Sequence, residues 1–170
     1  MIASRLPAFA KLGPKLDRAG RELANLDAFL AGYDALPPEQ RTTWGRLTAI
    51  AAALHNADNG IEDVLLGIAK DVDGAAPTGD TSHQDLLDQM RAQIPGLRPA
   101  VLDDELYVSL MELKGFRHRV RHNHGFDHDA GRTEQNRALM QATFPKLVEA
   151  VRTLENRPTG SGADDPAERP

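Results

Sequence analysis

The sequence contains no cysteine and few aromatic residues, and both shortages limit what the chain can do. Without cysteine there is neither a disulfide framework nor a thiolate metal site, which is compatible with a reducing cytoplasm. Aromatic residues make up 5% of the chain. Trp44 and Tyr107 are too isolated to predict a platform on which nucleic-acid bases stack.

Long apolar runs are also missing. The N-terminus lacks the apolar stretch of a signal peptide, and no segment reaches the roughly 18 apolar residues of a membrane span. We therefore expect a cytoplasmic protein that does not enter a membrane. The net charge of −5 argues against nonspecific coating of nucleic acid, because such binding scales with the number of phosphates neutralised. Any contact with nucleic acid must then be local.

The apolar residues that are present recur at alternating spacings of three and four, which is typical of one face of a helix. No segment alternates with period two over a useful length, so we predict an all-α bundle of four or five helices. The 170 residues suggest one domain, residues 1–156, followed by a disordered tail, residues 157–170, of proline, glycine, serine and charge. The predicted helices cover about 6–36, a long central segment ending near Val72, 82–94, 103–124 and a last segment around 140–154.

Several residues are expected to set the ends and weak points of these helices. Pro37 and Pro38 should close the first helix and start the second. Ser82 and Asp85 resemble a capping box, and Gly60 and Gly67 are expected to be tolerated weak points of the central helix. In the last helix Pro145 is a potential kink.

The segment from Lys114 to Asp129 has the most unusual composition. It holds four of the six histidines, and between Lys114 and His124 it carries four cationic side chains and no acidic one. Like charges one turn apart destabilise a helix, so this concentration of imidazole and guanidinium favours catalysis or the binding of an anion. His55 and His83 lie elsewhere on predicted helices, and for both we favour a structural role.

Four groups of residues, in order, resemble the HepT-like branch of the HEPN superfamily. They are Leu54-His55-Asn56 with Gly60-Ile61-Glu62, Asp71-Val72-Asp73-Gly74 with Pro77-Thr78-Gly79, His83 with Leu86-Leu87, and Phe116-Arg117-His118-Arg119-Val120-Arg121-His122 with Gly125-Phe126 and Asp129. The resemblance implies an all-α, commonly homodimeric protein and an endoribonuclease that needs no metal or other cofactor. It also implies a toxin paired with a nucleotidyltransferase antitoxin of the MntA type.

The family motif is an arginine and a histidine separated by four to six residues, and Arg117 and His122 fit it as the catalytic pair. His118 supplies the polar residue expected after the arginine. Arg119 and His124 have the same spacing, but the flanking Phe116 and Gly125 favour the first register. The resemblance gives supporting or RNA-binding roles to His118, Arg119, Arg121 and His124. His124 also stands where the family commonly has a tyrosine that receives AMP, which puts regulation by adenylylation in doubt.

The chemistry of these side chains suits cleavage of RNA without metal. A histidine can act as acid or base, and an arginine can neutralise the phosphorane as charge builds. On one helix Arg117 and His122 are about 7.5 Å apart along the axis and about 140° apart around it. They do not share a face, so we expect a composite groove formed with a second subunit.

Three other interpretations remain open. The cluster can be a solvated helix end stabilised by the dipole. The chain can be an inactive HEPN protein that binds RNA or nucleotide without cutting it. It can also be a zinc-binding helical protein, whose available ligands would be His118, His122, His124, Asp127, His128 and Asp129.

Overall fold

The computed structural model describes residues 7–79, 81–122 and 129–157, apart from the side chains of residues 8 and 117–122. Over these residues the chain forms five α-helices, one 3-10 turn and no strand, which confirms the predicted all-α fold. The predicted disordered tail falls almost wholly on residues 158–170, which are not among those described. The helices are α1 (Pro7–Asp34), α2 (Thr43–Asp71), α3 (Ser82–Arg91), α4 (Asp104–His122) and α5 (Ala130–Glu155).

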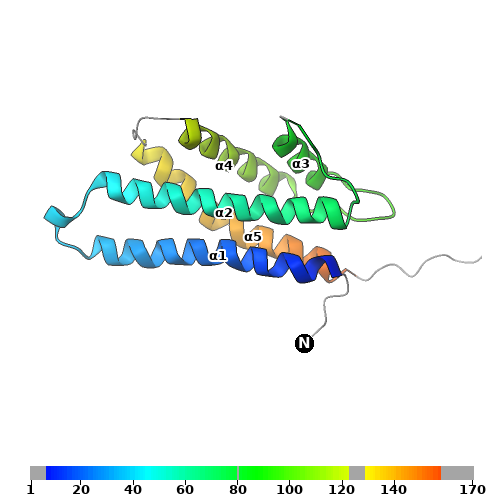
Figure 1. Ribbon diagram of the computed structural model, residues 1–170, viewed down its shortest axis with the longest axis horizontal. Helices are drawn as coiled ribbons and strands as arrows, with labels where there is room; N and C mark the ends of the chain where they lie inside the picture. The colour runs from blue at the N-terminus through cyan, green and yellow to red at the C-terminus, as the bar shows by residue number, and fades with distance from the viewer. Residues whose placement is uncertain (1–6, 80, 123–128, 158–170) are drawn as a thin grey trace, which may run out of the picture.

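The helix α2 is the centre of the bundle, and each of the other four helices packs against it. Helix α1 runs antiparallel to α2 and lies along its length, while α3 and α4 cover the other side (Figure 1). Helix α5 passes behind α2 and packs against α4 and α1. None of the described helices is long and apolar enough to cross a membrane.

The predicted apolar stripes form the core of this bundle. On α2 the stripe is buried from Leu47 to Ile68, and on α1 it is buried from Leu12 to Leu30. The ends of both stripes, Tyr33 and Val72, are partly exposed. The residues of α5 that meet this core are Met140, Leu147, Val151 and Leu154.

Two glycines of α2 are contact points with α1, which differs from the expectation that they are only weak points. A Cβ at Gly60 would lie 2.9 Å from the Cβ of Ala19, and one at Gly67 would lie 2.4 Å from Cδ2 of Leu12. Real Cβ atoms do not approach other carbons this closely, so a side chain at Gly60 would push the two helices apart, whereas one at Gly67 would displace the end of the Leu12 side chain. The small residues therefore set the short distance between α1 and α2.

Two predicted helix boundaries, the start of α2 and the end of α3, are wrong by a few residues. Pro38 opens a 3-10 turn, Pro38–Gln40, and α2 begins later with Thr42 as its cap, whose hydroxyl accepts from the Gly45 N–H at 3.1 Å. Helix α3 begins at Ser82 as predicted, but its N-cap residue is Thr81, whose hydroxyl donates to the Asp85 carboxylate at 2.7 Å. Helix α3 ends at Arg91 rather than near 94, since the chain then turns sharply and Gly96 adopts a φ of 76°.

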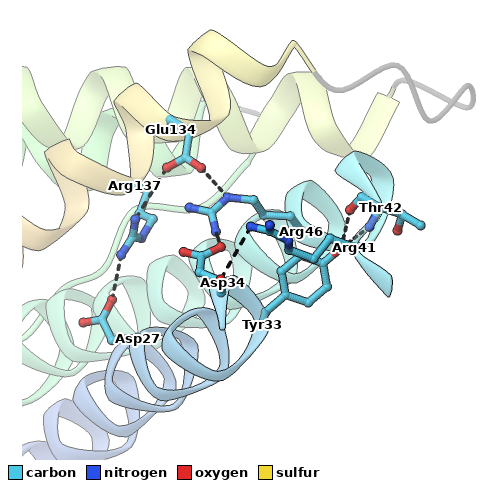
Figure 2. Close-up of polar contacts among 8 residues, drawn as sticks. All are labelled: Asp27, Tyr33, Asp34, Arg41, Thr42, Arg46, Glu134 and Arg137. Atoms are coloured by element: carbon cyan, nitrogen blue, oxygen red, sulfur yellow. Dashed lines mark hydrogen bonds and ion pairs between the residues drawn. The ribbon is translucent and has the colours of Figure 1, made fainter. Parts of the chain in front are cut away.

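A network of ion pairs ties α1, α2 and α5 together at the end of the bundle near Thr42 (Figure 2). Arg46 pairs with Asp34 at 2.6 Å and with Glu134 at 3.0 Å. Burial alone would lower the pKa of Arg46, but the hydrogen bonds and charges of Glu134 and Asp34 outweigh that effect and raise it. The network fixes the start of α5 relative to the α1–α2 hairpin.

Figure 2 also shows how the turn between α1 and α2 is held. The Tyr33 hydroxyl donates to the Thr42 carbonyl at 2.5 Å and accepts from the Thr42 N–H. Next along the network, Arg137 of α5 pairs with Asp27 of α1 at 3.1 Å. Each of these contacts joins residues of different elements, so together they fix how the hairpin and α5 meet.

Candidate functional site

The sequence motif lies at the end of α4, and the apolar part of the same helix positions it. Asp103 caps the helix by accepting from the Leu106 N–H at 2.8 Å. Leu106, Leu110, Leu113 and Phe116 are buried, so Phe116 is the last described core residue before the motif. The helix then continues through His122.

Of the predicted catalytic pair, Arg117 and His122, the structure describes the backbone and not the side chains. The same holds for His118, Arg119 and Arg121, while His124 is not among the described residues. The positions of the pair are nevertheless fixed by the helix. Position 117 lies within about 40° of the buried line of Leu110 and Leu113, whereas position 122 lies about 140° further around. The backbone therefore places residue 117 on the side of α4 that faces the bundle.

On that side, α2, α3 and α4 enclose a small depression of about 30 Å³. Its apolar lining includes Leu110 of α4. Four titratable side chains line it: Asp58 and Glu62 from α2, His83 from α3 and Lys114 from α4. Lys114 precedes Arg117 by three residues, which is about 4.5 Å along the helix axis. The depression thus lies beside the first turn of the motif.

His83 and Glu62 lie within hydrogen-bond distance of each other in this depression. The His83 Nδ1 atom lies 2.6 Å from Oε1 of Glu62, and their side chains are 43% and 23% exposed. A carboxylate only accepts hydrogen bonds, so Nδ1 must carry the proton in this contact. This leaves Nε2 as the nitrogen that can exchange a proton with another group, on a side chain that is partly exposed to solvent.

A second, smaller depression adjoins the first along α2. It is lined by His55 and Asp58 of α2, Phe116 of α4 and Met140 of α5. The Nε2 atom of His55 lies 3.1 Å from Nδ2 of Asn59, one turn along the same helix. Asp58 lines both depressions, so they adjoin at this residue of α2.

The position of His83 depends on how α3 is attached to its neighbours. Arg98, in the segment between α3 and α4, binds the carboxylate of Asp73 through two nitrogens at 2.5 and 2.6 Å. The same guanidinium also donates to the carbonyls of Gln89 and Ala92, each at 2.9 Å. Because this buried cluster joins the segments before and after α3, it fixes the helix that carries His83.

A surface contact attaches α3 to α4 as well. The Tyr107 hydroxyl of α4 donates to Asp88 of α3 at 2.7 Å, and the Arg91 guanidinium lies 4.7 Å from the centre of the Tyr107 ring. The hydrogen bond with Asp88 is the main cause that raises the pKa of Tyr107. Helix α3 is therefore held on α4 by its own side chains in addition to the buried arginine.

Within the described part of the chain, no group of three or more histidine, aspartate or glutamate side chains is arranged to hold a metal ion. The ligands suggested by the sequence fall on residues whose side chains are not described, with the exception of Asp129. That carboxylate caps α5 by accepting from the Arg132 N–H at 3.0 Å. The structure thus gives a helix-capping role to this one member of the predicted ligand set.

Comparison with known proteins identifies the family. A family model described as HepT-like protein matches residues 49–157, which is more than half of the chain. The chain belongs to the HepT-like family. The match contains α5 and nearly all of α2, and it leaves out α1. No curated protein and no solved structure matches the chain.

The fold brings together HepT-like residues that are far apart in the sequence. His55 and Glu62 of α2, His83 of α3 and Phe116 of α4 were all part of the resemblance, and all four line the adjoining depressions. The sequence analysis missed Asp58 and Lys114 as members of this surface. The spacing of Asp58 and Glu62, four residues apart on a predicted helix, could have indicated that they share a face.

Proposed function

We propose that this HepT-like protein is a cytoplasmic, metal-independent endoribonuclease and the toxin of a toxin–antitoxin pair. The observation that carries the proposal is the family membership of a chain in which Arg117 and His122 have the family spacing. The position of the motif supports it, because residue 117 lies on the side of α4 next to a depression lined by titratable groups.

In the proposed reaction the ribose 2′-hydroxyl oxygen attacks the adjacent phosphorus, and the bond from phosphorus to the 5′-oxygen breaks. Arg117 neutralises the charge that builds on the nonbridging oxygens. His122 exchanges a proton with one of the two reacting oxygens. His118, Arg119, Arg121 and His124 hold the RNA backbone, and the products are a 2′,3′-cyclic phosphate and a 5′-hydroxyl.

The proposal includes a homodimer. Positions 117 and 122 lie about 140° apart around α4, so they are not on one face of the helix of a single chain. A second copy packed near the ends of both α4 helices would complete the groove. The proposed partner that controls the enzyme is a nucleotidyltransferase antitoxin of the MntA type.

Product chemistry tests the function directly. Purified protein incubated with cellular RNA should yield fragments that end in 2′,3′-cyclic phosphate. RNA that is retained by the protein but never shortened would instead identify an inactive binding protein. The reading frame next to the gene gives an independent test of the toxin role, because a small nucleotidyltransferase is expected there.

A further inference from the structure

The proposed cleavage needs two proton-transfer groups, and Glu62 and His83 lie close to the position of the motif arginine. Cleavage without metal requires a proton acceptor for the 2′-hydroxyl and a proton donor for the leaving 5′-oxygen. Each copy of the motif contributes one histidine, at a position about 140° around α4 from position 117. The side of α4 that carries position 117 therefore does not carry the motif histidine of its own chain.

The depression beside Lys114 contains a suitable group. His83 is 43% exposed, and its Nδ1 lies 2.6 Å from the Glu62 carboxylate. This contact orients the ring, and Nε2 is then the nitrogen that can accept a proton. A carboxylate that orients an imidazole in this way also stabilises the positive charge that appears when the ring accepts a proton. A histidine that only filled space in the core would be buried among apolar atoms.

The groups that face His83 come from α2 and α4. Asp58 and Glu62 place carboxylates beside the ring, whereas Lys114 places a positive charge there that can attract a phosphate. Lys114 lies about one turn before Arg117 on α4. An RNA phosphate held by Arg117 would consequently lie close to the depression that holds His83.

We propose that His83 is the general base of the reaction and that Glu62 is its positioning residue. The inference rests on the proposed function. The Nε2 atom of His83 takes the proton from the 2′-hydroxyl as that oxygen bonds to phosphorus. The phosphorus–5′-oxygen bond then breaks, and the leaving oxygen receives a proton from the His122 that the second copy brings to the groove. No oxidant, reductant or metal takes part.

A substrate with sulfur in place of the leaving 5′-oxygen separates the two histidines. A thiolate leaves without receiving a proton, so this substrate needs a base but no acid. His83→Ala should slow cleavage of both the oxygen and the sulfur substrate by about 10²- to 10⁴-fold. His122→Ala should slow only the oxygen substrate. Gln84→Ala, on the exposed neighbour of His83, is the matched control and should cleave both at the native rate.

Glu62→Gln tests the positioning role. The amide keeps an acceptor near Nδ1 but removes the charge, so the acidic limb of the pH–rate profile should move to lower pH while the melting midpoint stays the same. An unchanged profile would contradict the role of Glu62.

Other outcomes decide the wider assignment. If His83→Ala cleaves both substrates at the native rate, His83 is not the base. The same conclusion follows if this variant cleaves the oxygen substrate slowly but the sulfur substrate at the native rate. If the native protein cleaves neither substrate, the ribonuclease function itself fails. That result is distinct, because it appears before any variant is compared.

Discussion

Asp73 and Arg98 form a buried ion pair across the two ends of the α3 segment, with side chains only 2% and 1% exposed. Asp73 follows α2, and Arg98 lies in the connection between α3 and α4. Gln89 of α3 also donates to the Asp73 carboxylate, at 2.7 Å. The pair thus determines where α3 lies, and α3 carries His83.

The first prediction is that removing either member of the Asp73–Arg98 pair destabilises the fold. Asp73→Ala leaves a buried guanidinium without its counter-charge and should lower the free energy of unfolding by about 3–5 kcal/mol. Asp104→Ala is the matched control, because it breaks an exposed pair with Arg91 at 2.8 Å and should cost less than about 1 kcal/mol. Urea unfolding of both variants measures the difference. Equal losses would mean that the buried pair does not anchor α3.

A second prediction concerns the contact between α1 and α2. Gly60→Ala should destabilise the fold by about 1–3 kcal/mol, because the new methyl group would lie 2.9 Å from the Cβ of Ala19. Gly32→Ala on α1 is the control, since a Cβ there meets nothing within 4 Å. That change should stabilise the helix by about 0.5–1 kcal/mol. Thermal melts that move in the same direction for both variants would refute the close-packing explanation.

The third prediction is that the protein is a dimer. Light scattering at micromolar concentration should give about twice the chain mass of 18.5 kDa. The reason is the divergent placement of positions 117 and 122 on α4, which leaves a single chain with an incomplete groove. A monomer that cleaves RNA at the full rate would remove the composite groove from the mechanism.

The fourth prediction concerns metal ions. If histidines transfer the protons, an excess of EDTA should leave the cleavage rate unchanged, and purified protein should contain no stoichiometric transition metal. One tightly bound zinc per chain, lost in both His118→Ala and His122→Ala, would instead support the metal site that the sequence left open.

The helical periodicity was sufficient to predict the fold class and most of the core, because burial of one face per helix produces a regular spacing. It could not reveal the Asp73–Arg98 pair, whose members are 25 residues apart and come from segments without periodicity. The close contacts that the α2 glycines make with α1 could not be predicted for a similar reason. Whether a glycine weakens a helix or permits a close contact depends on the neighbouring helix, which a single segment does not specify.

The candidate site was predictable in part. The motif on α4 stands out by composition, and the resemblance already included Glu62 and His83. Their contact at 2.6 Å joins α2 to α3 and depends on how the loop between those helices folds. A lone helical histidine has no spacing signal for such a partner, so a structural role was the reasonable expectation for His83 from sequence.

Activity should depend on Arg117 and His122 while stability should not. Both follow the last described core residue of α4, so alanine there removes a charge or a proton-transfer group without deleting core packing, and the melting midpoint should shift little. Leu110→Ala or Leu113→Ala on the same helix should instead cost about 2–5 kcal/mol. Glu112→Ala, at an exposed position of α4, is the control for both properties.

The most direct measurement uses two matched RNAs that differ by one 2′-deoxy substitution at the mapped cleavage site. The native protein should cut the first RNA and not the second. Arg117→Ala and His122→Ala should cut neither and still bind RNA. If these two variants cut at the native rate and Arg119→Ala and His124→Ala do not, the motif register is displaced by two residues. Cleavage of the 2′-deoxy RNA at the native rate would contradict the mechanism itself.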